Sequence, residues 1–293
     1  MNIVRITSGL GNQIFQYAFY RALKQSVPDT KMDISEFNYR KHHYGYELEK
    51  IFNIVPNYAN RKERNALADV SKHWLSEVRR KYFKIKLNCS GELIRENVIG
   101  HQFHPELTNA HNSYFQGFWQ SEKYFINIAG QLRTELTFKQ TLNKENQSVI
   151  DEIIRCNSVS IHIRRGDYIK KRRIDAVGSV CTLAYYKQAI EYIKSKTESP
   201  RFFVFSDEID WVKDNLNIEN AYFVDINRGE NSFRDMQLMS LCNHNIIANS
   251  SFSWWGAWLN SHPNKIVVAP NVWFRDTDMP DILPKNWIQI TVD

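Results

Sequence analysis

The chain has 293 residues, which is enough for about two domains of ordinary size. Hydrophobic residues make up 43% of it and charged residues 24%, a composition that excludes a disordered or low-complexity protein. The net charge is +6, but it is concentrated: residues 61–86 hold nine Lys and Arg against three acids, and residues 164–173 hold six against one. The remainder of the chain is acidic, so the sequence indicates anionic ligands at two places.

Cysteine usage and hydropathy indicate the compartment. The four cysteines are dispersed and none forms a C-x-x-C pair (Cys89, Cys156, Cys181 and Cys242). This pattern predicts reduced thiols and no zinc site. No run of about 18 apolar residues occurs, and the first six residues resemble a strand rather than a signal peptide. We therefore expect a cytoplasmic protein without a membrane span.

The first half of the chain mixes strand and helix signals. A strand is predicted at residues 2–6, followed by a glycine-containing turn and a helix with one apolar face. A second strand is expected at residues 32–34, a charged helical stretch at 60–82 and a strand at 114–119. Ser121 is a plausible start for a helix running toward Phe138.

The second half alternates more regularly. Strands are predicted at residues 159–163, 202–205, 222–224, 245–248 and 266–269. Helices are predicted at residues 183–194 and 234–241, with one more that ends near residue 216 and another that begins near residue 251. Such alternation is typical of βαβ units and a parallel sheet. The polar residues 138–145 are the expected linker. We predict an α/β protein with two Rossmann-like domains, residues 1–142 and 143–293, facing across a cleft that binds ligands at the carboxyl ends of strands.

Residues 160–168, Ser-Ile-His-Ile-Arg-Arg-Gly-Asp-Tyr, give the strongest chemical signal. Arg164 and Arg165 leave the end of a predicted strand, where guanidinium groups can bind the oxygens of a diphosphate. Asp167 could orient either arginine or accept a hydrogen bond from a ligand hydroxyl. The alternative is a solvated basic turn with a local Arg–Asp pair.

Residues 249–258, Asn-Ser-Ser-Phe-Ser-Trp-Trp-Gly-Ala-Trp, form a second candidate site. A polar turn that opens a helix leaves backbone N–H groups and hydroxyls able to hold an anion. Ser251 or Ser253 could instead simply cap the helix. We expect the tryptophans to belong to the core rather than to a ligand platform.

Two acidic segments complete the candidates in this half. Asp207 directly follows a predicted strand, where it could meet a sugar or base or else cap the helix that carries Trp211. Asp276, Thr277 and Asp278 match a metal-binding D-x-D by letter, but we expect an exposed loop there and no metal site.

The turn at residues 8–13 resembles half of a dinucleotide-binding fingerprint. Ile14 stands where the third glycine would be, so a nicotinamide oxidoreductase is weakly supported. Gly9 and Gly11 still allow a ligand to approach the backbone, and we expect Asn12 and Gln13 to present their amides to it. A nucleic-acid binder is a further alternative, although the sequence contains no recognised module of that kind.

Three segments together resemble one known family. Residues 8–18 are similar to the opening motif of the family 11 glycosyltransferases, the α-1,2-fucosyltransferases, and residues 162–168 to their H-x-R-R-G-D-Y donor motif. Residues 235–242, continuing through 249–255, are similar to a third motif. Ser8 and Phe15 are mild departures, since the family usually has Gly and Met there.

The resemblance implies a GT-B fold and inverting transfer of L-fucose from GDP-L-fucose to the 2-hydroxyl of a galactoside, without a metal or other cofactor. It implies that Arg164 binds the β-phosphate and that Arg164 and Asp167 serve catalysis. The implied donor-site lining also includes His162, Arg165, Tyr168, Asp207, Asn249, Ser250, Ser251 and Ser253. Gly9, Gly11, Asn12 and Gln13 would face the acceptor, which in bacterial members is commonly a lipid-linked surface glycan or free lactose.

Two matters stay open at the level of sequence. A base should assist the acceptor hydroxyl, and the sequence does not choose among Asp33, Glu36, His42, His43 and Glu47. The basic residues 61–86 belong to none of the motifs. They form either a solvated helix face or an electrostatic contact with anionic lipid or a lipid-linked acceptor at the inner face of the membrane.

Overall fold

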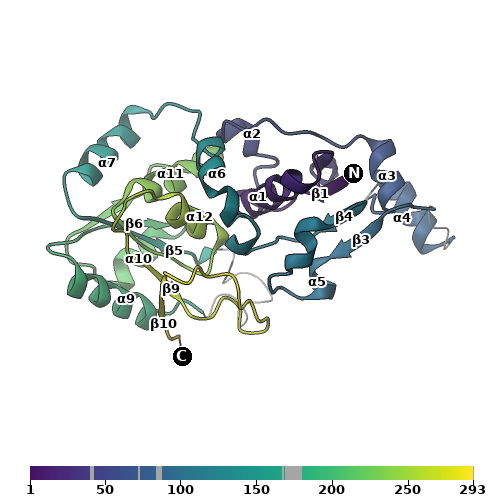
Figure 1. Cartoon of the computed structure of the whole chain (residues 1–293). Coiled ribbons are helices and arrows are strands. Elements are labelled where there is room, and N and C mark those ends of the chain that lie inside the picture. Colours follow the sequence, from purple (N-terminus) through teal and green to yellow (C-terminus); the bar gives the residue numbers. More distant parts are fainter. Residues whose placement is uncertain (40–42, 72, 84–87, 167, 169–179, 293) are drawn as a thin grey trace. The chain divides into compact units, whose positions relative to one another are not determined.

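The computed structural model describes residues 1–39, 43–71, 73–83, 88–166, 168 and 180–292. Its internal contacts divide the chain into two compact units, Met1–Lys139 and Gln140–Asp293, a few residues before the boundary expected from the sequence. Each unit contains one parallel β-sheet with helices, so the predicted α/β class is confirmed (Figure 1).

Unit 1 is built on a four-stranded parallel sheet in the order β2-β1-β4-β3. The strands are β1 (Asn2–Arg5), β2 (Thr30–Asp33), β3 (Glu92–Arg95) and β4 (Ser113–Gln116). Val4 pairs with Met32 on one side and Phe115 on the other, so the centre of the sheet is apolar and buried. The edge strand β3 was not predicted, because only Ile94 of its four residues is buried.

The long helix α1 (Leu10–Ser26) supplies most of the apolar core of unit 1. Phe19 on α1 stacks on Trp119 with ring centroids 4.7 Å apart, and its ring meets Phe115 of β4 edge-on. The remaining elements of this unit are short: η1 (Ser35–Asn38), α2 (Leu48–Ile51), α3 (Arg61–Leu67), α4 (Trp74–Lys81), α5 (Glu96–Ile99), η2 (Pro105–Asn109), η3 (Glu122–Tyr124), η4 (Ile126–Ile128) and α6 (Ala129–Glu135).

The predicted helical stretch at residues 60–82 is two helices, not one. Asn60 and Glu63 form a capping box that starts α3, which ends where Leu67 and Ala68 enter the core beside Ile3 and Tyr114. Burial of these two residues turns the chain before α4 begins at Trp74. The helix predicted from Ser121 is likewise interrupted, since Ser121 caps only the single turn η3.

Unit 2 contains a six-stranded parallel sheet in the order β10-β9-β8-β5-β6-β7. The strands are β5 (Ser158–Ile163), β6 (Arg201–Ser206), β7 (Ala221–Val224), β8 (His244–Ile246), β9 (Val267–Pro270) and β10 (Ile288–Ile290). Counted from β5, this is the strand order 3-2-1-4-5-6 of a dinucleotide-binding fold. Its order reverses between β5 and β8, and ligands bind at such a switch point, outside the carboxyl ends of the strands.

The described helices of unit 2 alternate with these strands as predicted, except that the first helix begins inside the segment expected to be a linker. They are α7 (Lys144–Ile154), α9 (Leu183–Lys196), α10 (Ile209–Asn215), α11 (Phe233–Leu241) and α12 (Ser251–Leu259), with the short η6 (Gly229–Asn231). The predicted linker at residues 138–145 already contains the start of α7. There the Asn143 side chain caps the helix by accepting from the backbone N–H of Asn146.

Two whole-chain expectations can be compared with the structure. Each of the four cysteines is a free thiol. Within the described ranges, none of the helices combines the length and apolar character needed to cross a membrane.

Candidate functional site

The switch point of unit 2 gathers residues from three separate sequence segments. Arg164 follows β5, Asp207 follows β6, and Asn249 lies between β8 and α12. All three come from the carboxyl ends of parallel strands, which lie at one edge of the sheet. The structure therefore brings the Arg-Arg-Gly segment and Asp207 together, as their positions after the strands predicted.

Asp207 holds the turn that carries the two arginines. Its Oδ2 lies 3.0 Å from Nη1 of Arg164, and its Oδ1 accepts from the backbone N–H of Arg165 at 2.9 Å. A Cβ atom added to Gly166 would lie 3.0 Å from the same Oδ2. Asp207 does not cap α10, whose N-cap position is Glu208. Of the two roles considered for Asp207, the structure shows contact with the arginine turn.

The arginines themselves point to different partners. The side chain of Arg164 is 29% exposed and its guanidinium lies 5.9 Å from the ring centre of Tyr168. The guanidinium of Arg165 instead stacks on the ring of Trp211 at 3.2 Å, and its Nε lies 3.3 Å from Glu208. Arg165 therefore ties the turn to α10, while Arg164 is the arginine next to the switch point. Asp167, predicted to act with them, lies outside the described residues.

His162 lies beneath this turn as a neutral side chain. It is buried in β5, and burial together with the nearby Arg164 lowers its pKa to about 4. Its Nδ1 has no hydrogen-bond partner among the described residues, and its ring lies 5.8 Å from that of Phe252. The hydroxyl of Tyr186 donates to its backbone carbonyl and fixes the end of the strand.

The turn between β8 and α12 faces the same edge of the sheet. Ser250 is the N-cap residue of α12 and makes no side-chain capping bond, and Ser251 is half-buried. Ser253 is fully buried, and its hydroxyl donates to the carbonyl of Ser250 at 3.2 Å. The first N–H groups of a helix lack intrahelical acceptors, so this end of α12 presents partial positive charge.

The three tryptophans of α12 belong to the core, as predicted. Trp254 and Trp255 are completely buried and Trp258 is 3% exposed. Trp254 also donates from its indole N–H to the carbonyl of Ile282, while Asn249 donates to the carbonyl of Trp273. Through these two bonds the β8–α12 segment fixes both ends of the loop between β9 and β10.

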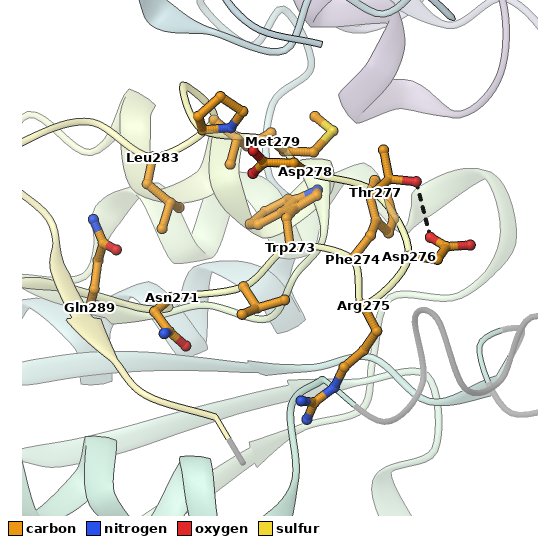
Figure 2. A pocket seen from close by; sticks show the side chains of 13 residues that line it. Asn271, Trp273, Phe274, Arg275, Asp276, Thr277, Asp278, Met279, Leu283 and Gln289 are labelled. Atoms are coloured by element: carbon orange, nitrogen blue, oxygen red, sulfur yellow. Dashed lines mark hydrogen bonds between the residues drawn. The ribbon is translucent and has the colours of Figure 1, made fainter. Parts of the chain in front are cut away.

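That loop encloses a cavity of about 430 Å³ at the same edge of unit 2. Figure 2 shows its lining side chains, among them Trp273, Arg275, Met279 and Gln289. Asp276 and Asp278 lie here on an exposed stretch of loop, and the hydroxyl of Thr277 donates to Asp276. Among the described residues, no three His, Cys, Asp or Glu side chains form a group that could hold a metal ion.

In unit 1, the predicted acceptor-side turn lies at the carboxyl end of β1. Gln13 is completely buried, and its amide donates to the carbonyls of Ser8 and Gly45 and accepts from the N–H of Glu47. Its amide group therefore binds the protein's own backbone. Asn12 is half-buried and accepts from Gln120 at 2.7 Å.

The two glycines and Ser8 of this turn differ in what they require. Gly11 is buried at the start of α1, and a Cβ added to Gly9 would lie 3.0 Å from the ring of His43. Ser8 has a φ of +71°, a conformation that favours glycine. A positive φ costs glycine little, which is a physical reason for the glycine that the family 11 glycosyltransferases usually have at this position.

The candidate bases divide into engaged and accessible groups. Asp33 accepts from the hydroxyl of Tyr114 at 2.6 Å and lies 3.5 Å from Nε of Arg64. Glu36 forms a buried ion pair with Arg5. Both carboxylates are thus committed to ion pairs with arginines.

Glu47 is buried, whereas His43 is exposed beside Gly9. His42 lies outside the described residues.

Two further residues of unit 2 were not predicted from sequence. Trp211 supports Arg165, and an aromatic residue four positions after Asp207 was the available signal. Asp235 at the start of α11 is half-buried and accepts from Asn227 at 2.9 Å, and desolvation raises its pKa to about 7. Sequence placed Asp235 in a motif but could not show that its carboxyl group is desolvated.

Comparisons with known proteins agree with this architecture. The sequence model of Glycosyl transferase family 11 matches residues 1–291. An alpha-1,2-colitosyltransferase of Escherichia coli is 34% identical in an alignment of 299 positions that covers 98% of this chain and 98% of that protein. The O-antigen biosynthesis glycosyltransferase WbnK of Escherichia coli is 31% identical in an alignment of 313 positions that covers 97% of this chain and 99% of that protein.

More distant similarities extend to fucosyltransferases. Galactoside alpha-(1,2)-fucosyltransferase 1 of Homo sapiens is 30% identical over 152 residues, 49% of this chain and 42% of that protein. The crystal structure of NodZ alpha-1,6-fucosyltransferase soaked with GDP-fucose superposes with a TM-score of 0.50 at 16% identity, covering 88% of this chain and 91% of that one. This likeness concerns the fold, and the predicted GT-B class is confirmed.

Proposed function

Because the chain belongs to glycosyltransferase family 11, we propose that it transfers L-fucose from GDP-L-fucose to the 2-hydroxyl of a terminal galactoside, with inversion. The observation that carries the proposal is Arg164, held by Asp207 at the switch point of unit 2. It lies at the sheet edge that also presents the N-terminus of α12. A guanidinium and a helix N-terminus together form a site for a diphosphate.

The charge that develops in the reaction explains why this arrangement suits the transfer. The acceptor 2-hydroxyl attacks the anomeric carbon, the bond from that carbon to the diphosphate oxygen breaks, and GDP leaves with added negative charge. Arg164 and the first N–H groups of α12 would stabilise that charge. The hydroxyl proton would pass to a base, for which His42, His43 and Glu47 stay candidates because Asp33 and Glu36 are paired with arginines.

We propose further that the transfer needs neither a metal nor another cofactor. In this reading Arg164 supplies the positive charge that a divalent cation would otherwise bring to the diphosphate. Activity that is unchanged by EDTA is the expected result.

GDP-colitose is a second candidate donor. The alpha-1,2-colitosyltransferase is 34% identical over nearly the whole length of both chains, which supports this alternative. Colitose is L-fucose without its 3-hydroxyl, so the diphosphate contacts proposed for Arg164 apply equally to both donors. Only contacts to the 3-hydroxyl would separate them, because a site built to bind a hydroxyl rejects the analogue that lacks it.

The proposed setting is the synthesis of a surface glycan at the cytoplasmic side of the membrane, with a free or lipid-linked galactoside as acceptor. The full-length similarity to the O-antigen biosynthesis glycosyltransferase WbnK supports this setting. Nucleotide-sugar donors are made inside the cell, which is consistent with it.

One assay tests the proposal. The purified chain is incubated with GDP-fucose or GDP-colitose and a panel of galactosides, with and without EDTA, and the product linkage is determined by NMR. We expect an α-1,2-linked product that forms equally well in EDTA. A product linked at another hydroxyl, or loss of activity in EDTA, would contradict the mechanism. A marked preference for GDP-colitose would assign the second donor.

A further inference from the structure

Helix α4 of unit 1 (Trp74–Lys81) is amphipathic but has no buried residue. A surface helix normally packs its apolar stripe against the core of its own domain. Here Trp74 is 64% exposed and Leu75 53%, and just beyond the helix Tyr82 is 70% and Phe83 66% exposed. Several large apolar side chains therefore lie together on one short segment, and the core of the protein does not cover them.

The spacing of these side chains makes them a continuous stripe. Trp74, Val78 and Tyr82 follow one another at intervals of four residues, so they share one face of the helix, with Leu75 beside them. The exposed Tyr39 extends this surface, because its ring meets His73 edge-on at 5.9 Å and His73 adjoins Trp74. We call this set, together with Phe83 and the basic residues 79–81, the α4 patch.

Positive charge borders the stripe. Arg79 and Arg80 share the single carboxylate of Asp69, which leaves the pair with excess positive charge. Lys81 is exposed, with its Nζ 5.5 Å from the ring centre of Tyr82. Glu77 is the one acid of the helix, and together with Asp69 it sets two carboxylates against three cations, which leaves a net positive charge beside the stripe.

We propose that the α4 patch binds the surface of an anionic lipid bilayer. Tryptophan and tyrosine side chains favour the level of the lipid headgroups, and arginine and lysine stems can lie along apolar surface while their charges reach anionic headgroups. An eight-residue helix spans only about 12 Å, so α4 would lie in the interface rather than cross it. A two-fold contact between copies of the chain would instead bring like charges together.

The proposal rests on this surface alone and does not depend on the donor chemistry of unit 2. Its test is cosedimentation of the full chain with vesicles of phosphatidylcholine, with or without phosphatidylglycerol. We expect binding only to the phosphatidylglycerol vesicles, weakening as salt is raised. Neutralising Arg79 and Lys81 to Gln should weaken binding roughly five-fold for each charge removed. Trp74→Ala combined with Tyr82→Ala should weaken it on the order of ten-fold or more.

Matched control variants distinguish binding through the α4 patch from nonspecific adsorption to the vesicles. Ile154→Ala on α7 removes a side chain that is 69% exposed, and Lys213→Gln removes an exposed charge on α10; both should bind like the parent chain. Every variant other than Arg79→Gln replaces an exposed residue, so its melting temperature should be unchanged. Arg79 is half-buried and contacts Asp69, so Lys81→Gln alone is the charge variant that leaves folding untouched. Equal loss in the control variants, or no binding to the phosphatidylglycerol vesicles, would overturn the proposal. So would concentration-dependent dimers that Trp74→Ala abolishes in the absence of vesicle binding, since the patch would then serve a second copy.

Discussion

Replacing Gln13 by Met tests whether the opening motif acts through structure or through direct substrate contact. Methionine fills a similar volume but can neither donate nor accept strongly. In the parent chain Nε2 of Gln13 donates to the carbonyls of Ser8 and Gly45 at 2.9 and 2.8 Å, and Oε1 accepts from the N–H of Glu47 at 3.0 Å. The substitution therefore leaves three backbone groups without their partner at a fully buried position.

The cost follows from these contacts. A buried polar group that loses its partner costs about 1–3 kcal/mol, so three groups give a destabilisation of about 3 kcal/mol or more. That is a large share of the roughly 5–15 kcal/mol that stabilises a typical domain. Asn12→Ala is the matched comparison, since Asn12 is only half-buried and water can replace its contacts. It should cost about 1 kcal/mol or less.

Urea unfolding followed by circular dichroism measures both changes. We expect Gln13→Met to lower the free energy of unfolding well below that of Asn12→Ala. If Gln13→Met kept the parent stability and instead raised KM for the galactoside, Gln13 would contact the acceptor directly. The structural role assigned to its amide would then be refuted.

Three further changes test unit 2. Gly166→Ala would place a Cβ 3.0 Å from Oδ2 of Asp207, so we expect a raised KM for the donor in steady-state kinetics with an unchanged melting temperature. The pKa of His162 is lowered to about 4, so the unfolded chain binds more protons between pH 4 and 6.5 and stability falls as pH falls through this window. His162→Phe should remove that part of the acid dependence of the melting temperature. The pKa of Asp235 is raised to about 7, so the folded chain holds the extra proton and stability falls as pH rises from about 4 to 7. Asp235→Asn can still accept from Asn227, so at about pH 8 its free energy of unfolding should exceed that of the parent by on the order of a few kcal/mol. At about pH 4 the two chains should be equally stable.

The fold of unit 2 was largely predictable because several of its strands, among them β6 and β9, are apolar runs. Residues 202–205 read Phe-Phe-Val-Phe and all four are buried, so strand and burial coincide in the sequence. The edge strand β3 reads Glu-Leu-Ile-Arg and is mostly exposed, so it carried no such signal. The break between α3 and α4 depends on Leu67 and Ala68 packing beside Ile3, a contact distant in sequence.

The candidate site was predictable in position but not in contacts. Motifs after strands placed Arg164 and Asp207 at one sheet edge, and the structure joins them at 3.0 Å. The stacking of Arg165 on Trp211 and the hydrogen bonds of the Gln13 amide to the backbone depend on tertiary packing, which local sequence patterns do not predict. The different partners of the two arginines, Asp207 for Arg164 and Trp211 for Arg165, therefore required the structure.

The central claim is that Arg164 binds the diphosphate of the donor. Isothermal titration of GDP into the parent chain and Arg164→Ala tests it without requiring any acceptor. Arg201→Ala serves as the control, because Arg201 also pairs with a carboxylate on the surface of unit 2, Glu152, but at the opposite end of β6. Charge-assisted hydrogen bonds contribute about 1.5–3 kcal/mol each, so Arg164→Ala should weaken GDP binding about ten-fold to a hundred-fold and Arg201→Ala should leave it unchanged. GDP binding by Arg164→Ala with the affinity of the parent chain would contradict the account.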